Sequence, residues 1–138
     1  MTTRVLFLCT HNAARSQMAE GLLRRMAGNR FEVESAGTAP TDVHPLAVAV
    51  MREIGIDVSR QRAKDVSEIE GNPDIVITLC DEAKEACPVF PGAPRFLHWS
   101  LPDPAAARGD EAAAMAVFRP VRDTLAGLIR KFIEGVEQ

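Results

Sequence analysis

The chain has 138 residues, 46% of them hydrophobic and 25% charged, which is enough for one domain over residues 1–138 with its own core. A formal net charge of −3 gives no reason to expect nucleic-acid binding, and the sequence has neither an apolar run of membrane-spanning length nor a signal-peptide pattern. We therefore expect a cytoplasmic protein with no nucleic-acid or membrane partner, whose three cysteines are reactive thiols rather than a disulfide framework.

Four short segments have the composition of β-strands. Residues 4–8 and 74–79 are continuous apolar runs, which are typical of strands covered on both faces. Residues 31–35 and 95–99 are more mixed in polarity, as edge strands often are. The two apolar strands are therefore expected in the centre of the sheet and the two mixed strands at its edges.

Helices are predicted between the strands and after the last one. Gly28 and Gly55 stop the first two, and Pro120 is expected to kink the last helix or to mark the start of its second half. The predicted helices cover residues 16–27, 45–54, a short stretch from Asp81, and 110–134. This alternation indicates an α/β fold, here a four-stranded parallel sheet in the order 2-1-3-4 with helices on both faces.

Cys9 and Arg15 bracket a loop between the first predicted strand and the first predicted helix. A strand, a tight loop and a helix N terminus direct backbone N–H groups and a positive dipole end at one spot, where a tetrahedral oxyanion can bind. The positive electrostatic potential at this spot also favours a thiolate over a thiol, which makes Cys9 a candidate nucleophile. The predicted oxyanion-binding residues are Thr10, His11, Asn12, Ala13, Ala14, Arg15 and Ser16.

Two side chains of this loop strengthen the interpretation. Asn12 tolerates a left-handed backbone and can tie a tight loop together. Ser16 directly follows the arginine and can offer its hydroxyl to the thiolate. The plain alternative is a buried cysteine at a strand end beside a solvated arginine.

The predicted strand order brings a second cysteine to the same place. Ligands of doubly wound sheets bind at the carboxyl ends of the strands, where Cys9 ends the first strand and Cys80 ends the third, about 5 Å away. Cys80 and Cys87 lack zinc-finger spacing, so we predict no metal site. In an intact helix their Cα atoms lie roughly 10 Å apart, beyond the about 7 Å that a disulfide allows. Bridging them requires the segment to unwind; otherwise both are inert thiols.

Asp103 lies between Pro102 and Pro104, just after the fourth predicted strand. A carboxylate held on this rigid segment at the carboxyl edge of the sheet can protonate a leaving oxygen as a general acid. The alternative is an aspartate that only forms an Asx-turn. His44, His98 and Trp99 are edge or loop residues, and of these we expect His98 to face the site.

Together these motifs resemble the arsenate reductases built on the low-molecular-weight protein tyrosine phosphatase fold, over nearly the whole chain. The likeness rests on the oxyanion loop with its extension Ser16-Gln17-Met18-Ala19-Glu20-Gly21, then Glu34-Ser35-Ala36-Gly37, Thr78-Leu79-Cys80, Cys87-Pro88, His98-Trp99, Asp103-Pro104-Ala105 and Val121-Arg122-Asp123. The resemblance implies arsenic detoxification by reduction of arsenate to arsenite, with phosphate or sulfate as analogues of the substrate.

The resemblance also implies a role for each cysteine. Cys9 attacks arsenate, Arg15 and the loop amides hold its oxygens, and Asp103 protonates the departing oxygen. Cys80 then attacks Cys9, releases arsenite and forms a Cys9–Cys80 disulfide, and Cys87 attacks Cys80 to give a Cys80–Cys87 disulfide. An external thiol system, thioredoxin or glutaredoxin, reduces that bond. No tightly bound cofactor is implied, and a monomer is expected.

Three positions depart from the pattern of these relatives. Many carry glycine where this chain has His11 and a further cysteine where it has Ala14. Some hold a potassium ion through residues matching Asn12, Glu20 and Ser35, with an aspartate whose counterpart here is Lys64. We expect the Lys64 ammonium to replace that ion, so potassium dependence is in question.

Two other functions fit part of the sequence. A phosphatase acting on phosphotyrosine or a small phosphate ester needs only the loop and Asp103, and a weak phosphatase side activity is expected in any case. Against it stand the absence of tyrosine, the alanines at 105 and 106 where such phosphatases usually carry aromatic residues, and the lack of a use for Cys87. A non-catalytic thiol sensor needs the loop and the cysteines but not Asp103.

Overall fold

The computed structural model describes residues 2–80, 90 and 94–136. Its centre is a four-stranded sheet in the order β2-β1-β3-β4, with all neighbouring strands parallel. The strands are β1 (Thr3–Cys9), β2 (Phe31–Gly37), β3 (Ile75–Thr78) and β4 (Arg95–His98). The strand order and the central positions of β1 and β3 confirm the predictions from hydrophobic patterning. All four residues of β3 are buried, as a continuous apolar run requires.

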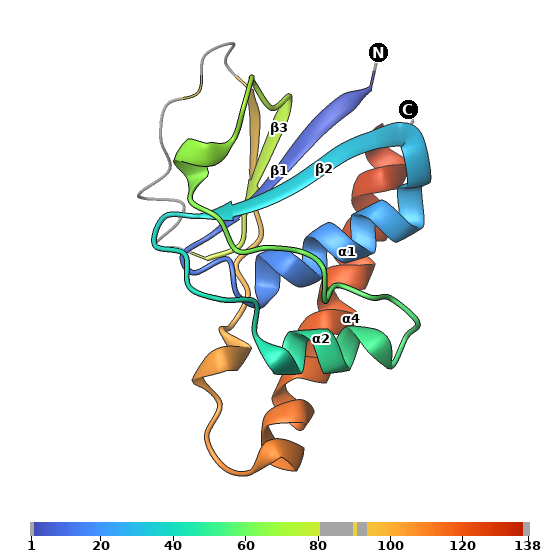
Figure 1. The fold of residues 1–138 in the computed structure, drawn as a ribbon. Helices are drawn as coiled ribbons and strands as arrows, with labels where there is room; N and C mark the ends of the chain where they lie inside the picture. The colour runs from blue at the N-terminus through green and yellow to red at the C-terminus, as the bar shows by residue number, and fades with distance from the viewer. Residues whose placement is uncertain (1, 81–89, 91–93, 137–138) are drawn as a thin grey trace.

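The two faces of the sheet have different covers. Val5 and Phe7 of β1 belong to a large core with α1 (Arg15–Ala27) and α4 (Glu111–Val136). Figure 1 shows these helices together on one side of the sheet. The alternate residues Leu6 and Leu8 pack on the other face with residues around the 3₁₀-helix η2 (Val66–Glu68). The described α-helices thus all lie on one face, and the helix predicted from Asp81 lies outside the described residues.

Glycine and helix-capping signals place the helix ends close to the predicted positions. α1 ends before Gly28, which has a φ of 58°. α2 (Pro45–Arg52) begins with proline in its first turn, and the ring nitrogen Nδ1 of His44 accepts a hydrogen bond from the N–H of Leu46 at 3.1 Å. α2 is two residues shorter than predicted at its C terminus.

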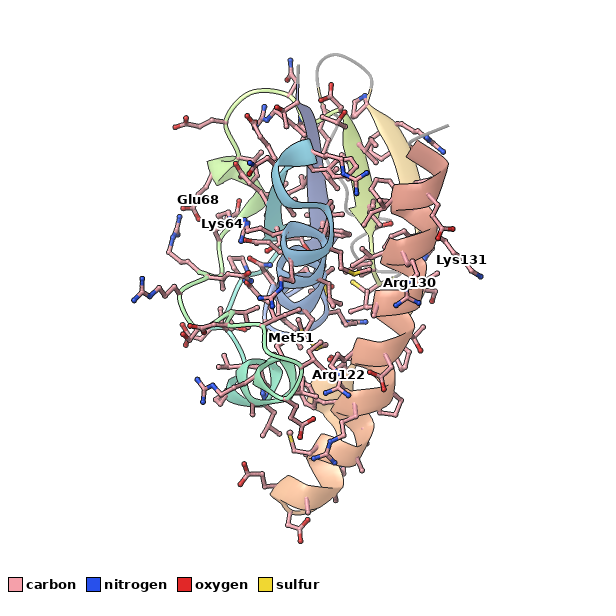
Figure 2. All side chains as sticks on the ribbon, turned by 90° about the vertical axis from the view of Figure 1, so that its right-hand side faces the viewer. Met51, Lys64, Glu68, Arg122, Arg130 and Lys131 are labelled. Carbon is pink, nitrogen blue, oxygen red and sulfur yellow. The ribbon has the colours of Figure 1, made fainter. Side chains whose placement is uncertain are left out.

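The last helix is a single element through Pro120. The residues that α4 buries recur every three or four positions, as an amphipathic helix on a core requires. The apolar ones are Met115, Phe118, Val121, Leu125, Ile129, Phe132 and Ile133. Arg130 and Lys131, labelled in Figure 2, point away from this core. None of the helices among the described residues is long and apolar enough to cross a membrane.

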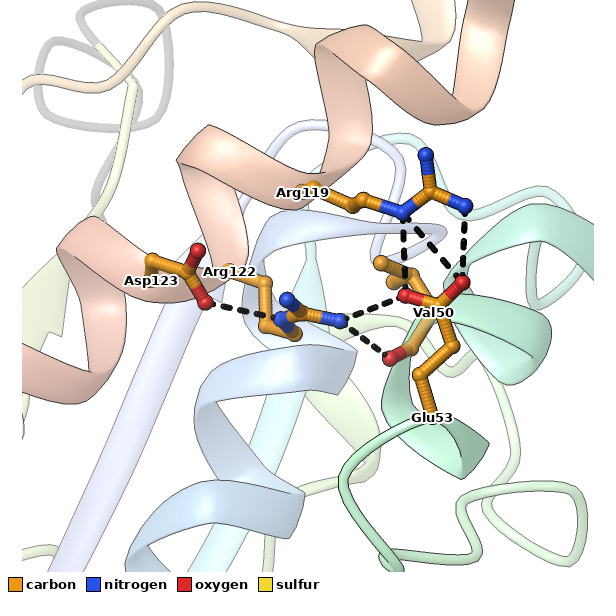
Figure 3. A network of polar contacts seen from close by, with 5 residues as sticks. All are labelled: Val50, Glu53, Arg119, Arg122 and Asp123. Carbon is orange, nitrogen blue, oxygen red and sulfur yellow. Dashed lines mark hydrogen bonds and ion pairs between the residues drawn. The ribbon is translucent and has the colours of Figure 1, made fainter. Parts of the chain in front are cut away.

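Charged side chains join α2 to α4 through exposed Glu53 and Arg119 and buried Arg122 (Figure 3). The Glu53 carboxylate accepts hydrogen bonds from Arg119 Nη2 at 2.8 Å and from Arg122 Nη1 at 2.8 Å. Arg122 also donates to the Val50 carbonyl at 2.9 Å and to Asp123 Oδ1 at 2.9 Å. The Arg119 and Arg122 guanidinium groups lower the pKa of Glu53 from its ordinary 4.5 to about 2. This network fixes α2 against α4 away from the carboxyl edge of the sheet.

Candidate active site

The loop after β1, residues 9–16 and hereafter the oxyanion loop, is held by its carbonyl groups. The carbonyls of Cys9, Thr10, His11 and Ala13 accept hydrogen bonds from backbone N–H groups of residues 38, 39, 41 and 44, at 2.8 to 3.3 Å. The Asn12 carbonyl accepts one from Gln17 Nε2 at 2.9 Å. In a trans peptide the next N–H points opposite to the C=O, so these bonds turn the amides of residues 10–14 to the inside of the loop.

The inward amides of residues 11–14 have no acceptor within the described structure, while the Thr10 N–H interacts with Cys9. No oxygen among the described residues accepts a hydrogen bond from the N–H groups of residues 11–14. α1 then begins with no side-chain cap at Ala14 and no acidic residue in its first turn. An uncapped helix N terminus behind a ring of free amides is a binding site for an anion.

Arg15 adds a fixed positive charge to this loop. Its side chain is 8% exposed. The guanidinium donates from Nη1 to the Leu101 carbonyl at 2.9 Å, and its Nη2 lies 3.9 Å from Asp103 Oδ2. Its Nε is buried and has no hydrogen-bond partner among the described residues. A buried donor without a partner is costly, so Arg15 is expected to donate to a bound oxyanion.

Asn12 supports the oxyanion loop through buried hydrogen bonds. It is fully buried and is the one non-glycine residue with positive φ, 51°, among those described. Its side-chain amide donates to Ser16 Oγ at 2.8 Å and to Ser35 Oγ at 3.0 Å, and its Oδ1 accepts from the backbone N–H of Lys64 at 3.0 Å. These hydrogen bonds agree with the prediction that Asn12 ties the loop together. Ser16 accepts from Asn12, and no described contact joins its hydroxyl to Cys9.

Cys9 and Cys80 meet at the carboxyl edge of the sheet. Both thiols are free and buried, and Thr10 Oγ1 lies 3.2 Å from the Cys80 sulfur. Cys9 and Cys80 pack in the same buried cluster. The neighbouring Cys80 side chain and burial raise the pKa of Cys9, while Arg15 and the backbone N–H of Thr10 act in the opposite direction. Arg15 and the Thr10 N–H thus act in the direction expected for a thiolate at Cys9, and the neighbouring Cys80 side chain acts against it.

A cavity of about 310 Å³ opens in front of Cys80, and Cys9 lines a smaller pocket that shares His11, Arg15 and Asp103 with it. Asp103 lies on its rim and has two roles: Oδ1 accepts from the N–H of Ala105 at 3.0 Å, which is the Asx-turn alternative, while Oδ2 faces Arg15. The residues that line the cavity are Thr10, His11, Arg15, Cys80, Ser100, Leu101 and Asp103. The structure thus gathers Cys9, Cys80, Arg15 and Asp103 in one place, and Cys87 lies outside the described residues.

The structure also differs from two expectations about charged and polar neighbours. His98 bonds through Nδ1 to Thr78 Oγ1 at 2.7 Å and does not line this cavity. Glu20 is paired with Arg24, at 2.8 Å between Oε2 and Nη2, rather than with Lys64. Lys64, labelled in Figure 2, contributes its backbone to Asn12, and its ammonium forms no ion pair among the described residues.

Two contributors to the site could not be found from sequence motifs. The Leu101 carbonyl that orients Arg15 has no local signal, and the motif that contains Gln17 does not indicate that its amide holds the Asn12 carbonyl. Gly37 is a third, and its sequence context gives a partial hint. A Cβ at this position would lie 2.5 Å from the Thr10 carbonyl oxygen, so the oxyanion loop packs directly on the end of β2.

Comparison with protein families agrees with this arrangement of sheet, loop and helix. Residues 4–138 match the family described as low molecular weight phosphotyrosine protein phosphatase, and the chain belongs to this family. A solved low molecular weight protein tyrosine phosphatase from T. tengcongensis is similar to it, with a TM-score of 0.80 and 29% identity over 97% of this chain and 99% of that one.

Arsenate reductases are among the curated proteins that are similar to this chain. The arsenate reductase of Bacillus subtilis is 41% identical over 94% of both chains, and that of Bacillus licheniformis is 43% identical over 96% of both. A solved arsenate reductase in its oxidized state has a TM-score of 0.83 and 31% identity, covering 98% of this chain and 99% of that one. The thioredoxin-dependent arsenate reductase of Corynebacterium glutamicum has a TM-score of 0.75 over 99% of this chain and 62% of that one.

Proposed function

We propose that this protein reduces arsenate to arsenite, with Cys9 as the nucleophile and Cys80 as the thiol that resolves its adduct. The observation that carries the proposal is that Cys9 and Cys80, from the carboxyl ends of the neighbouring strands β1 and β3, pack in one buried cluster beside the oxyanion loop. Hydrolysis of a phosphate ester needs one thiol, whereas reduction needs a second thiol that can reach the first. The similarity to arsenate reductases over 94% to 96% of the chain supports the same activity.

Arsenate binds in the oxyanion loop through charge and geometry. The amides of residues 10–14 and the Arg15 guanidinium surround a tetrahedral anion, and phosphate and sulfate are expected to bind as analogues. His11 lines the same cavity and bonds through Nδ1 to the Ala39 carbonyl at 3.1 Å. The carbonyl can only accept, so this contact places a proton on Nδ1 and leaves Nε2 of neutral His11 as an acceptor.

In the first chemical step the Cys9 sulfur attacks arsenic and one arsenate oxygen leaves as water. The Cys9–arsenic bond forms, the arsenic–oxygen bond breaks, and Asp103 passes a proton to the departing oxygen. Over the whole step the Cys9 thiol loses one proton and the departing water gains one, so the protons balance. Arsenic remains in its pentavalent state in this adduct.

The second step transfers the electrons. The Cys80 sulfur attacks Cys9 and a disulfide forms between them. The bonding pair of the sulfur–arsenic bond stays on arsenic, which leaves as arsenite and takes up the proton that the Cys80 thiol loses. Cys87 then attacks Cys80 and releases Cys9, and an external dithiol reduces the Cys80–Cys87 bond. Thioredoxin is our first expectation for that dithiol, with glutaredoxin as the alternative, and the thioredoxin-dependent neighbour from Corynebacterium glutamicum supports it.

The decisive experiment is a single turnover of arsenate by the pre-reduced wild type and by Cys80→Ser and Cys87→Ser, followed by disulfide mapping. The wild type is expected to yield one arsenite and a Cys80–Cys87 disulfide, while Cys87→Ser stops at the Cys9–Cys80 disulfide. Wild-type protein that yields no arsenite, but hydrolyses an aryl phosphate efficiently, would establish the phosphatase instead.

The role of Asp103 is tested against a matched aspartate. Asp103→Asn keeps the turn but removes the acid, so turnover is expected to fall by about 100- to 10,000-fold. Asp110 makes the same kind of contact, from Oδ1 to the N–H of Ala113 at 2.9 Å, away from the cavity. Asp110→Asn is therefore expected to turn over normally. A thiol sensor without catalysis would be indifferent to both changes.

A further inference from the structure

The oxyanion loop rests on a closed ring of hydrogen bonds between side chains from distant parts of the sequence. The ring begins at the side-chain amide of Asn12 and returns to the backbone carbonyl of the same residue. Its members, in order, are Asn12, Ser35, Glu20, Arg24, Gln61 and Gln17. We call it the Asn12 ring.

One half of the ring runs through the buried carboxylate of Glu20. Asn12 Nδ2 donates to Ser35 Oγ at 3.0 Å, and the Ser35 hydroxyl donates to Glu20 Oε1 at 2.6 Å. Asn12 and Ser35 are fully buried, and the Glu20 side chain is 7% exposed. An ionised carboxylate at this depth requires a counter-charge, and Ser35 supplies none.

Arg24 supplies that charge from the surface. Its Nη2 lies 2.8 Å from Glu20 Oε2 and also donates to the Val33 carbonyl at 2.8 Å, while the side chain as a whole is 51% exposed. Arg24 is one turn after Glu20 on α1, so the helix itself sets the spacing of the pair.

The other half of the ring leads from Arg24 back to the loop backbone. Arg24 Nη1 donates to Gln61 Oε1 at 3.3 Å, and Gln61 Nε2 donates to Gln17 Oε1 at 2.8 Å. Gln17 Nε2 then donates to the Asn12 carbonyl at 2.9 Å. The left-handed Asn12 is thus held from both its side chain and its carbonyl, and Arg24 is the shared origin of both paths.

We propose that Arg24 is a positioning residue for the oxyanion loop: it neutralises buried Glu20 and anchors the Asn12 ring, which keeps the loop amides directed at the anion. This proposal builds on the proposed function only in naming arsenate as the natural anion. Binding of inorganic phosphate tests it without any reduction, so the two proposals fail separately.

The primary variant is Arg24→Gln, with inorganic phosphate titrated into the full-length reduced protein by calorimetry well below the unfolding midpoint. Loss of the guanidinium leaves Glu20 buried without a counter-charge, so phosphate affinity is expected to fall about tenfold or more. Arg24→Lys keeps the positive charge and is expected to retain most of the affinity. The double variant Glu20→Gln/Arg24→Gln removes both charges, so it is expected to regain most of the phosphate affinity that Arg24→Gln loses.

Two controls separate positioning from general stability. Arg25→Gln removes the neighbouring exposed arginine, whose Nη1 donates to the Gly55 carbonyl at 3.3 Å outside the ring, and is expected to bind phosphate normally. Glu53→Gln removes the ion pairs between α2 and α4, so it is expected to lower the unfolding midpoint without weakening phosphate binding.

The proposal is overturned if Arg24→Gln binds phosphate as the wild type does, or if Arg24→Lys loses as much affinity as Arg24→Gln. An equal loss of phosphate affinity in Glu53→Gln would also overturn it, because the effect would then follow stability alone. Should Arg24→Gln not fold, the lysine variant and the double variant decide, and loss of phosphate binding in both would refute the proposal.

Discussion

Removing the Cys80 thiol is expected to make Cys9 easier to ionise. The Cys80 contact is the largest of the effects that raise the pKa of Cys9, and Arg15 and the Thr10 N–H remain to lower it. A buried hydrogen bond contributes about 0.5 to 1.5 kcal/mol, which corresponds to about one pKa unit. Cys80→Ala is therefore expected to move the titration midpoint of Cys9 down by about one pH unit.

The expected change in reactivity is smaller than the change in ionisation. One unit raises the thiolate fraction about tenfold, but intrinsic nucleophilicity falls with pKa with a coefficient of about 0.4 to 0.5, so alkylation at neutral pH rises by only about threefold. Iodoacetamide labelling of Cys9 across a pH series, followed peptide by peptide in a mass spectrometer, gives both the midpoint and the rate.

The comparison is made in a Cys87→Ala background, so that disulfide exchange does not interfere. Ser100→Ala changes the same cavity wall while leaving both thiols in place, and its midpoint is expected to match that of the background. A Cys80→Ala midpoint that is unchanged, or that moves upward, would show that the Cys80 contact does not suppress the thiolate.

Two further variants test features away from the thiols. The pKa of Glu53 is held near 2 by Arg119 and Arg122, so its ion pairs stabilise the fold above its ordinary value of 4.5 and lose this effect as pH falls toward 2. Glu53→Gln is expected to melt below the wild type at pH 7 and level with it near pH 2, and a gap independent of pH in scanning calorimetry would refute this. Gly37→Ala would bring a Cβ to 2.5 Å from the Thr10 carbonyl, so phosphate affinity is expected to fall while β2 stays paired, as seen by calorimetry and amide exchange.

Hydrophobic patterning was sufficient to predict the sheet. β1 and β3 contain the two continuous apolar runs, and such runs are only stable when both faces of a strand are covered, which places them in the centre. Gly28 marks the end of α1 because glycine adopts a positive φ, here 58°, at little energetic cost, and such a residue commonly ends a helix. The oxyanion loop was predictable for the same reason, since its spacing and its two flanking elements are contiguous in sequence.

Features that depend on contacts between remote segments were harder to predict. Nothing near Arg24 in the sequence indicates that it pairs with a buried carboxylate, and nothing near Gln61 indicates that it reaches back to the loop. Lys64 was expected to supply the missing positive charge because it aligns with a ligand position in relatives. The structure instead uses its backbone N–H, which any residue at that position offers. The raised pKa of Cys9 likewise follows from a neighbour 71 positions away.

The residues of the site are far apart in sequence, so the ribosome makes them at different times. Arg15 is oriented by the carbonyl of Leu101, 86 residues later, and Asn12 is tied to Lys64, 52 residues later. At ribosomal rates of about 5 to 20 residues per second, Leu101 follows Arg15 by between about 4 and 17 s. Throughout that interval Cys9 is an ordinary thiol on a nascent chain, without the enclosure that later governs its chemistry. The newly made protein is therefore most open to accidental oxidation at Cys9 before its partner thiol at Cys80 has been translated.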